Sequence, residues 1–134
     1  IWGWIGDLAD LNQENPEICT YLTDWIHDMA RKYRVDGFRL DTAVYIPKWF
    51  LSCFQNAAGT FMIGEVRTPS FEAHRWFSDA LSGLLNFPVT FQLEKSFGKG
   101  GSMKNMQQLL QKQSAMKYPD ENILGNFVDN HDQD

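Results

Sequence analysis

The stretch VDGFRLDTAVYIPKWF at residues 35–50 decides the fold. Apolar and charged side chains alternate along its GFRLD part, which predicts a β-strand with Arg39 and Asp41 together on one face. Pro47 suits the first turn of a helix, so we expect a helix directly after this strand. A strand followed by a helix is the repeating unit of parallel α/β folds.

The same alternation continues on both sides of this stretch. Asn15 and Pro16 provide a cap and a first turn for a preceding helix, and Gly59 ends the following helix before the segment TFMIGEV. The expected helices lie at about 16–34, 47–58 and 71–81 and from Ser102 onward, and the expected strands at 35–42, 60–66, 83–91 and 122–132.

Such strand–helix units predict right-handed βαβ connections and a parallel sheet, within an α/β fold. The chain has 134 residues, which is short of the roughly 250 that an eight-unit barrel needs. An open doubly wound sheet is the alternative at this length. It would require a phosphate-binding loop, and no glycine cluster of the sequence follows a strand and opens a helix with the required spacing.

The composition is that of a globular protein, with 43% hydrophobic and 14% aromatic residues and a formal charge of -5. Lys and Arg are scattered along the chain, so the sequence argues against a nucleic-acid partner. No segment approaches the roughly 18 apolar residues of a membrane span. Cys19 and Cys53 lack the spacing of a metal site, and we interpret them as buried apolar residues.

Carboxylates follow three of the expected strands: Asp41, Glu65 and Asp132. The strand ends of a parallel sheet lie at one rim, which brings these acids together. Arg39 is expected to keep Asp41 ionised, which leaves Glu65 to carry a proton near neutral pH. Cleavage of a glycosidic bond requires one carboxylate that attacks the anomeric carbon and one acid that protonates the leaving oxygen.

Four motifs, in matching order and at similar spacing, resemble segments of the α-amylase family, glycoside hydrolase family 13, and most closely its fungal-type members. They are LADLN at 8–12, GFRLD at 37–41, GEV at 64–66 and FVDNHD at 127–132. The resemblance implies a partial TIM (β/α)8 barrel, about strands 4 to 7 with their helices. Residues 1–14 would end the inserted loop domain of that family, on the calcium side, and residues 15–134 would form part of its catalytic barrel.

The resemblance also implies a role for each residue of the site. Asp41 would be the catalytic nucleophile and Glu65 the acid and then the base. Asp132, the third catalytic acid, would bind sugar hydroxyls and stabilise the transition state. Arg39 and His131 would complete the site as substrate-binding residues. These roles agree with the electrostatic expectation for Asp41 and Glu65.

Calcium is the cofactor that the resemblance implies. Asp10 is similar to the calcium carboxylate of the family, and the backbone carbonyl of Tyr45 is a second candidate ligand. Val44 and Tyr45 stand where many α-amylases have a Lys-His pair that serves the leaving-group side of the substrate. Val44 cannot hydrogen-bond a sugar hydroxyl, which leaves the balance between hydrolysis and transfer open.

As a whole, the resemblance implies a retaining hydrolase of α-1,4 bonds in α-glucans such as starch, glycogen and maltooligosaccharides. It also implies a monomer at full length and, from the habit of the family, secretion. An α-glucan transglycosylase of the same family and a non-catalytic, amylase-like binding protein are the alternatives. We expect the isolated chain to be inactive and poorly folded, because half a barrel exposes sheet edges and apolar faces.

The five tryptophans have no assigned role in this site. Trp2, Trp4 and Trp76 are candidates for platforms on which sugar rings stack, because flat aromatic rings suit the apolar faces of sugars. Trp25 and Trp49 fall on expected helices, and we interpret them as packing residues.

Overall fold

The computed structural model describes residues 7–132, so the candidate platforms Trp2 and Trp4 lie outside the described residues. The described part is an α/β fold around a parallel sheet with the strand order β1-β2-β3. The strands are β1 (Gly37–Leu40), β2 (Phe61–Gly64) and β3 (Gly83–Leu84). Leu40 pairs with Gly64, and Gly64 pairs with Leu84, so β1 and β2 end side by side.

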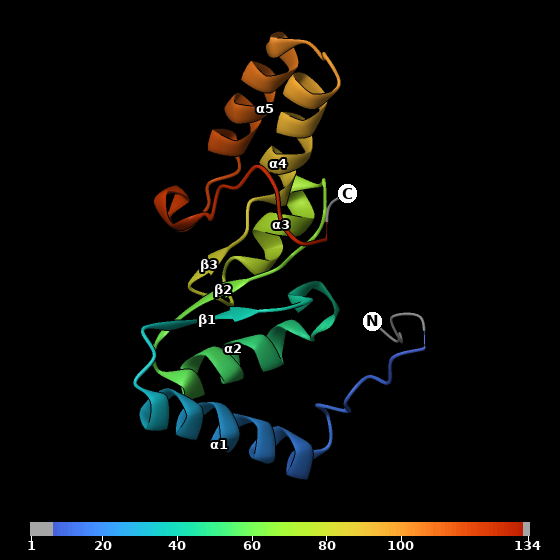
Figure 1. The fold of residues 1–134 in the computed structure, drawn as a ribbon. Coiled ribbons are helices and arrows are strands. Elements are labelled where there is room, and N and C mark those ends of the chain that lie inside the picture. The colour runs from blue at the N-terminus through green and yellow to red at the C-terminus, as the bar shows by residue number, and fades with distance from the viewer. Residues whose placement is uncertain (1–6, 133–134) are drawn as a thin grey trace.

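Helices alternate with the strands of this sheet along the chain. Figure 1 shows α1 and α2 stacked beside β1, with α4 and α5 at the opposite end of the molecule. The α-helices are α1 (Pro16–Tyr33), α2 (Lys48–Ala58), α3 (Phe71–Phe77), α4 (Phe87–Leu93) and α5 (Met103–Ala115). Three short helical turns complete the fold: η1 (Ala43–Tyr45), η2 (Glu94–Gly98) and η3 (Glu121–Ile123).

The helix ends confirm the capping signals of the sequence. The side chain of Asn15 accepts a hydrogen bond from the Glu17 amide at the start of α1, and Ser102 does the same for Lys104 at the start of α5. Gly59 ends α2 with a φ of 62°, a left-handed conformation that glycine adopts without steric cost. Local chemistry therefore fixes where these helices begin and end.

One apolar cluster joins the helices to the sheet. Leu51 from α2 and Met62 from β2 are both fully buried in it. Phe38 and Leu40 of β1 pack against the cluster, whereas Arg39 between them is exposed. The alternation expected for this strand is therefore confirmed, and the charged face of β1 is free to serve a site.

Two of the expected strands are wrong in length or type. The segment 83–91 is a strand only at β3, because Pro88 lacks an N–H for a ladder and instead fits the first turn of α4. The segment 122–132 is not a strand: it makes a single parallel bridge, between Leu85 and Gly125. The bridge partner Leu85 directly follows β3, which is two residues long, so no longer ladder forms beside it.

The tryptophans interpreted as packing residues are half-exposed, and of the two cysteines expected to be buried, Cys19 is partly buried against the core whereas Cys53 is exposed. Trp25 is 45% exposed and Trp49 is 47% exposed. Ile26 on α1 and Phe50 on α2 occupy the buried positions next to them, and adjacent helical residues point about 100° apart. The thiols of Cys19 and Cys53 are free, and Cys53 is exposed.

Apolar helices of membrane-spanning length were also sought in the structure. Between residues 7 and 132, no helix combines the length and the apolar character that crossing a membrane requires.

Candidate active site

The two carboxylates that the sequence places after adjacent strands do meet at one rim of the sheet. Asp41 directly follows β1 and Glu65 directly follows β2. The Glu65 amide donates to the Leu40 carbonyl at 2.9 Å, which continues the hydrogen bonding between the strands by one step. Rigid strand ends therefore hold both side chains, which is how a sheet fixes catalytic geometry better than a free loop would.

A single guanidinium joins these two acids. Arg39 Nη1 donates to Asp41 Oδ1 at 2.5 Å, and its Nη2 lies 3.2 Å from Glu65 Oε2. The three side chains differ in exposure: 65% for Asp41, 37% for Arg39 and 6% for Glu65. One carboxylate therefore faces the solvent while the other is buried, and both share the same positive charge.

The backbone after β1 supplies a second donor to the buried acid. The amide of Thr42 donates to Glu65 Oε2 at 3.0 Å. Thr42 has a φ of 48°, which is rare for a β-branched residue and costs free energy of about 1 to 2 kcal/mol. Strain of this kind is retained where the surrounding structure requires it, and here it aims an N–H at Glu65.

The pKa of Asp41 is shifted in the direction that the sequence analysis predicts. Its hydrogen bond with Arg39 lowers the pKa of the Asp41 carboxyl below the ordinary value, despite an opposing contribution from burial. The same hydrogen bond raises the pKa of Arg39. Asp41 is therefore an anion at neutral pH. That Glu65 carries a proton near neutral pH stays a prediction.

His131 and Asp132 come from the far end of the chain and complete the rim. Nε2 of His131 lies 3.4 Å from Asp132 Oδ2, and both side chains are well exposed. Both residues line a cleft of about 300 Å³ together with Asp41 and Glu65. The structure thus brings the expected acids and the expected histidine to one cleft, from segments up to 91 residues apart, since 132 − 41 = 91.

The cleft also contains two residues that the sequence reasoning did not assign. Thr42 and Arg67 line it beside the acids, and Val44 and Tyr45, which the sequence analysis did consider, form part of its wall. Arg67 follows Glu65 by two residues and is exposed. Its position just after a strand end is the same signal that identified the acids, so a search for every charged residue at this rim would have found it.

Only one of the two expected calcium ligands lies at the cleft. Asp10 is exposed and does not line the cleft, whereas Tyr45 does. Within residues 7–132, no group of three Asp, Glu, His or Cys side chains is arranged to hold a metal. Calcium takes six to eight oxygen ligands, so Asp10 and the Tyr45 carbonyl do not make a calcium site by themselves. Calcium binding stays a prediction.

Comparison with known proteins shows which proteins the chain is similar to. The chain is 34% identical over 132 residues to the β/α-amylase of Paenibacillus polymyxa and 32% identical over 135 residues to α-amylase 1 of Schizosaccharomyces pombe. These matches cover 97% and 96% of the chain. The chain is homologous to a segment of the α-amylases. No protein-family model matches it.

Solved α-amylase structures share the fold of this segment. The Anoxybacillus α-amylase superimposes over 97% of the chain with a TM-score of 0.90 and 31% identity. The Geobacillus thermoleovorans α-amylase, solved with acarbose, superimposes over 96% with a TM-score of 0.85 and 28% identity. The expected fold class, part of a TIM barrel, is therefore confirmed.

The chain is much shorter than these proteins. It spans 11% of the Paenibacillus protein and 22% of the yeast enzyme. It covers 30% of the Anoxybacillus chain. Whether residues 1–14 belong to a separate inserted domain stays a prediction, because the boundary at residue 15 is not tested by these matches.

Proposed function

We propose that this chain is the catalytic segment of a longer retaining glycosidase that cleaves α-1,4 bonds of starch-type and glycogen-type glucans. The observation that carries the proposal is the pair of unlike carboxyls, Asp41 exposed and Glu65 buried, joined by Arg39 at adjacent strand ends. Homology to named α-amylases supports the glucan as substrate. We expect the full-length protein to be a secreted monomer.

Each acid then has one part in a double displacement. Asp41 Oδ attacks the anomeric carbon while Glu65 donates its proton to the leaving glycosidic oxygen, so the C–O bond breaks as the glycosyl ester forms. Glu65 next removes a proton from water, which attacks the same carbon and releases Asp41. The guanidinium of Arg39 keeps Asp41 anionic for the first step, and Asp132 stabilises positive charge on the sugar ring.

The shared guanidinium favours retention of configuration. Retaining enzymes hold their two carboxyls about 5 to 5.5 Å apart, whereas inverting enzymes leave room for a water at roughly 6.5 to 9.5 Å. Two carboxylates that contact the two amino groups of one arginine are drawn toward the shorter separation. We therefore propose a covalent intermediate on Asp41.

Val44 favours a second candidate, transfer to another glucan. Its apolar side chain is half-buried in the wall of the cleft, beside Tyr45. An apolar wall offers no hydrogen-bond partner to an incoming water or to a sugar hydroxyl, but it can contact the apolar face of an acceptor sugar, which then competes with water for the intermediate. Transfer and hydrolysis would use the same carboxyls, and only the products distinguish them.

Proton NMR of the first products from maltoheptaose tests both the mechanism and its outcome, using the full-length protein that carries this chain. We expect α-configured reducing ends and chains shorter than the substrate. Initial β-configured ends would contradict retention, and products longer than the substrate would show transfer. The Glu65→Gln variant, which lacks the acid, should lose about 10⁴-fold or more in kcat.

A further inference from the structure

A second hollow lies next to the cleft, between the start of α2 and the end of α3. It has a volume of about 380 Å³ and is lined by Ile46, Pro47, Lys48, Trp49, Trp76 and Phe77. We call these six residues the tryptophan groove. Two indoles at one hollow are more than packing requires, because neither is buried: Trp49 is 47% exposed and Trp76 is 54% exposed.

Both indoles rest on buried aromatic rings. Trp49 meets Phe50 edge to face with 5.7 Å between centroids, and Trp76 meets Phe77 in the same way at 4.8 Å. Phe50 and Phe77 are only 3% and 5% exposed, so they belong to the core. A core ring therefore supports each exposed indole, which reduces the entropy that a ligand would have to remove on binding.

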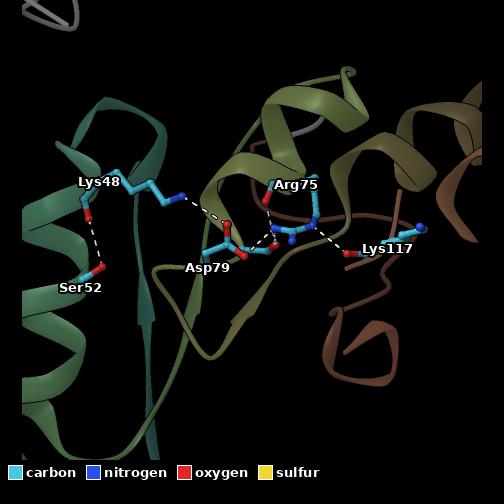
Figure 2. Close-up of polar contacts among 6 residues, drawn as sticks. Lys48, Ser52, Arg75, Asp79 and Lys117 are labelled. Carbon is cyan, nitrogen blue, oxygen red and sulfur yellow. Dashed lines mark hydrogen bonds and ion pairs between the residues drawn. The ribbon is translucent and has the colours of Figure 1, made fainter. Parts of the chain in front are cut away.

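One lining residue of the groove, Lys48, belongs to a charged cluster with Asp79 and Arg75. Lys48 reaches from the start of α2 to Asp79 at 3.4 Å, and Arg75 donates to the same carboxylate at 2.6 Å, as Figure 2 shows. The Lys48 ammonium also lies 4.8 Å from the centre of the Trp76 ring. Arg75 further donates to the Lys117 carbonyl at 2.9 Å, which fixes its position.

This combination suits a ligand with apolar faces and many hydroxyls. Lys48 and Arg75 share the single carboxylate of Asp79, so the three groups keep one net positive charge. The same ammonium, guanidinium and carboxylate can donate to or accept from hydroxyl groups. Aromatic rings beside polar groups of both kinds match a sugar ring, whose faces are apolar and whose edge is polar.

The groove and the cleft share a border. Tyr45 lines the cleft, and Ile46, the next residue, lines the groove. The short segment 43–47 therefore separates the acids from the indoles. A ligand long enough to pass this segment would contact both the acids and the indoles. A ligand of a few sugar units would occupy the cleft without reaching the indoles.

From these observations we propose that the tryptophan groove is a second binding site for an α-glucan chain, outside the catalytic cleft. The proposal rests on the proposed function for the identity of the glucan. It predicts that Trp49 and Trp76 contribute to the binding of long glucans and not to the chemistry on short ones.

The test compares polymer binding with short-substrate kinetics in the full-length protein. The double variant Trp49→Ala and Trp76→Ala should bind soluble starch roughly fivefold or more weakly in affinity electrophoresis. Its kcat and KM for maltotriose should stay within about twofold of wild type. Trp25→Ala is the matched control, because it removes an equally exposed helical indole elsewhere, and it should bind starch normally.

Two further measurements separate the possible outcomes. Replacing both indoles by Tyr should restore most of the starch binding, because a phenol ring can still stack. Unchanged starch binding in the alanine variant would overturn the proposal. The proposal would also be overturned if both indoles were protected from oxidation by N-bromosuccinimide in the ligand-free full-length protein. Another part of that protein would then fill the groove. Failure of the proposed function would appear separately, as wild-type protein that binds starch without cleaving it.

Discussion

At the scale of single residues, Arg39 controls the charge of the site. Its hydrogen bond is the largest contribution that lowers the pKa of Asp41, and it also contacts Glu65. A folded-state pKa below the ordinary value means that Asp41 stays ionised down to lower pH than a free carboxyl. The nucleophile is then available on the acidic side of neutrality.

Replacing Arg39 by Ala should therefore move the acid limb of kcat/KM to higher pH. Without the guanidinium, the pKa of Asp41 returns upward, and the nucleophile becomes protonated earlier as the pH falls. We expect a loss of about 10² to 10³ in kcat at neutral pH as well. Arg31→Ala, on the exposed last turn of α1, is the control and should leave the profile unchanged. An acid limb that does not move would contradict this role.

The sequence predicted Arg39 and Asp41 on one face because alternation along a strand requires it. It did not predict the left-handed backbone of Thr42, which supplies a donor to Glu65. No glycine or asparagine marks that position, and a positive φ at a threonine arises from the surrounding turn, not from local preference. Strained residues near a site are thus the part that sequence patterns miss.

At the scale of elements, His74 ties three segments together inside the fold. It is fully buried in α3, and its Nε2 donates to the Leu85 carbonyl at 3.0 Å, just after β3. Its Nδ1 accepts from the Tyr118 hydroxyl at 2.8 Å, beyond the end of α5. Burial raises the pKa of Tyr118, so that hydroxyl keeps its proton. Both contacts are satisfied by the neutral imidazole.

This tether should weaken in acid. Burial lowers the pKa of His74 below its unfolded value, so the folded state favours the neutral ring. Its contribution to stability is then fully present above about pH 6.5 and decreases as the pH falls below that value, because the unfolded state binds the proton. His74→Gln, which can donate and accept in the same places, should show a smaller loss.

Urea midpoints of the full-length protein at pH 7.5 and pH 5.5 measure this effect. The difference between the two midpoints should be smaller in His74→Gln than in wild type. His27→Gln serves as the control, because His27 is exposed and its ring is hydrogen-bonded to the Ala57 carbonyl on the protein surface. An equal acid loss in wild type and His74→Gln would show that other groups cause the acid sensitivity.

Most helix positions were predictable from caps and prolines, whereas α4 was expected as part of a strand and the last expected strand did not form. The caps act within three or four residues, so the sequence alone contains their information. Whether 122–132 pairs as a strand depends on the length of its neighbour β3, which ends before Pro88. Which distant segments pair with each other depends on the tertiary structure, and the periodicity of a single segment does not determine it.

At the scale of the whole molecule, the chain buries a core but leaves much apolar surface in contact with solvent. Phe97 is 68% exposed, Leu8 is 69% exposed and Val128 is 76% exposed. Within residues 7–132, β1 has a paired strand on one side only, and β3 has β2 and a single bridge. Open edges and exposed apolar side chains are features that a closed barrel would cover.

We therefore expect the isolated chain to unfold without a sharp transition and to show no glucan cleavage. Circular dichroism at 222 nm during heating, with the full-length protein as reference, measures this. The full-length protein should melt cooperatively, whereas the isolated chain should lose its signal gradually and bind a hydrophobic dye at room temperature. A cooperative melt of the isolated chain would contradict this expectation.

The central claim, that Asp41 forms a covalent bond to the sugar, is tested most directly by trapping that intermediate. The full-length protein is incubated with a 5-fluoro-α-glucosyl fluoride, which forms the glycosyl ester faster than water removes it, and is then digested and sequenced by mass spectrometry. The account predicts one added glycosyl group on the peptide containing GFRLD, located at Asp41, and none in Asp41→Asn. A label on Glu65, Asp132 or any other residue, with Asp41 unmodified, would contradict it.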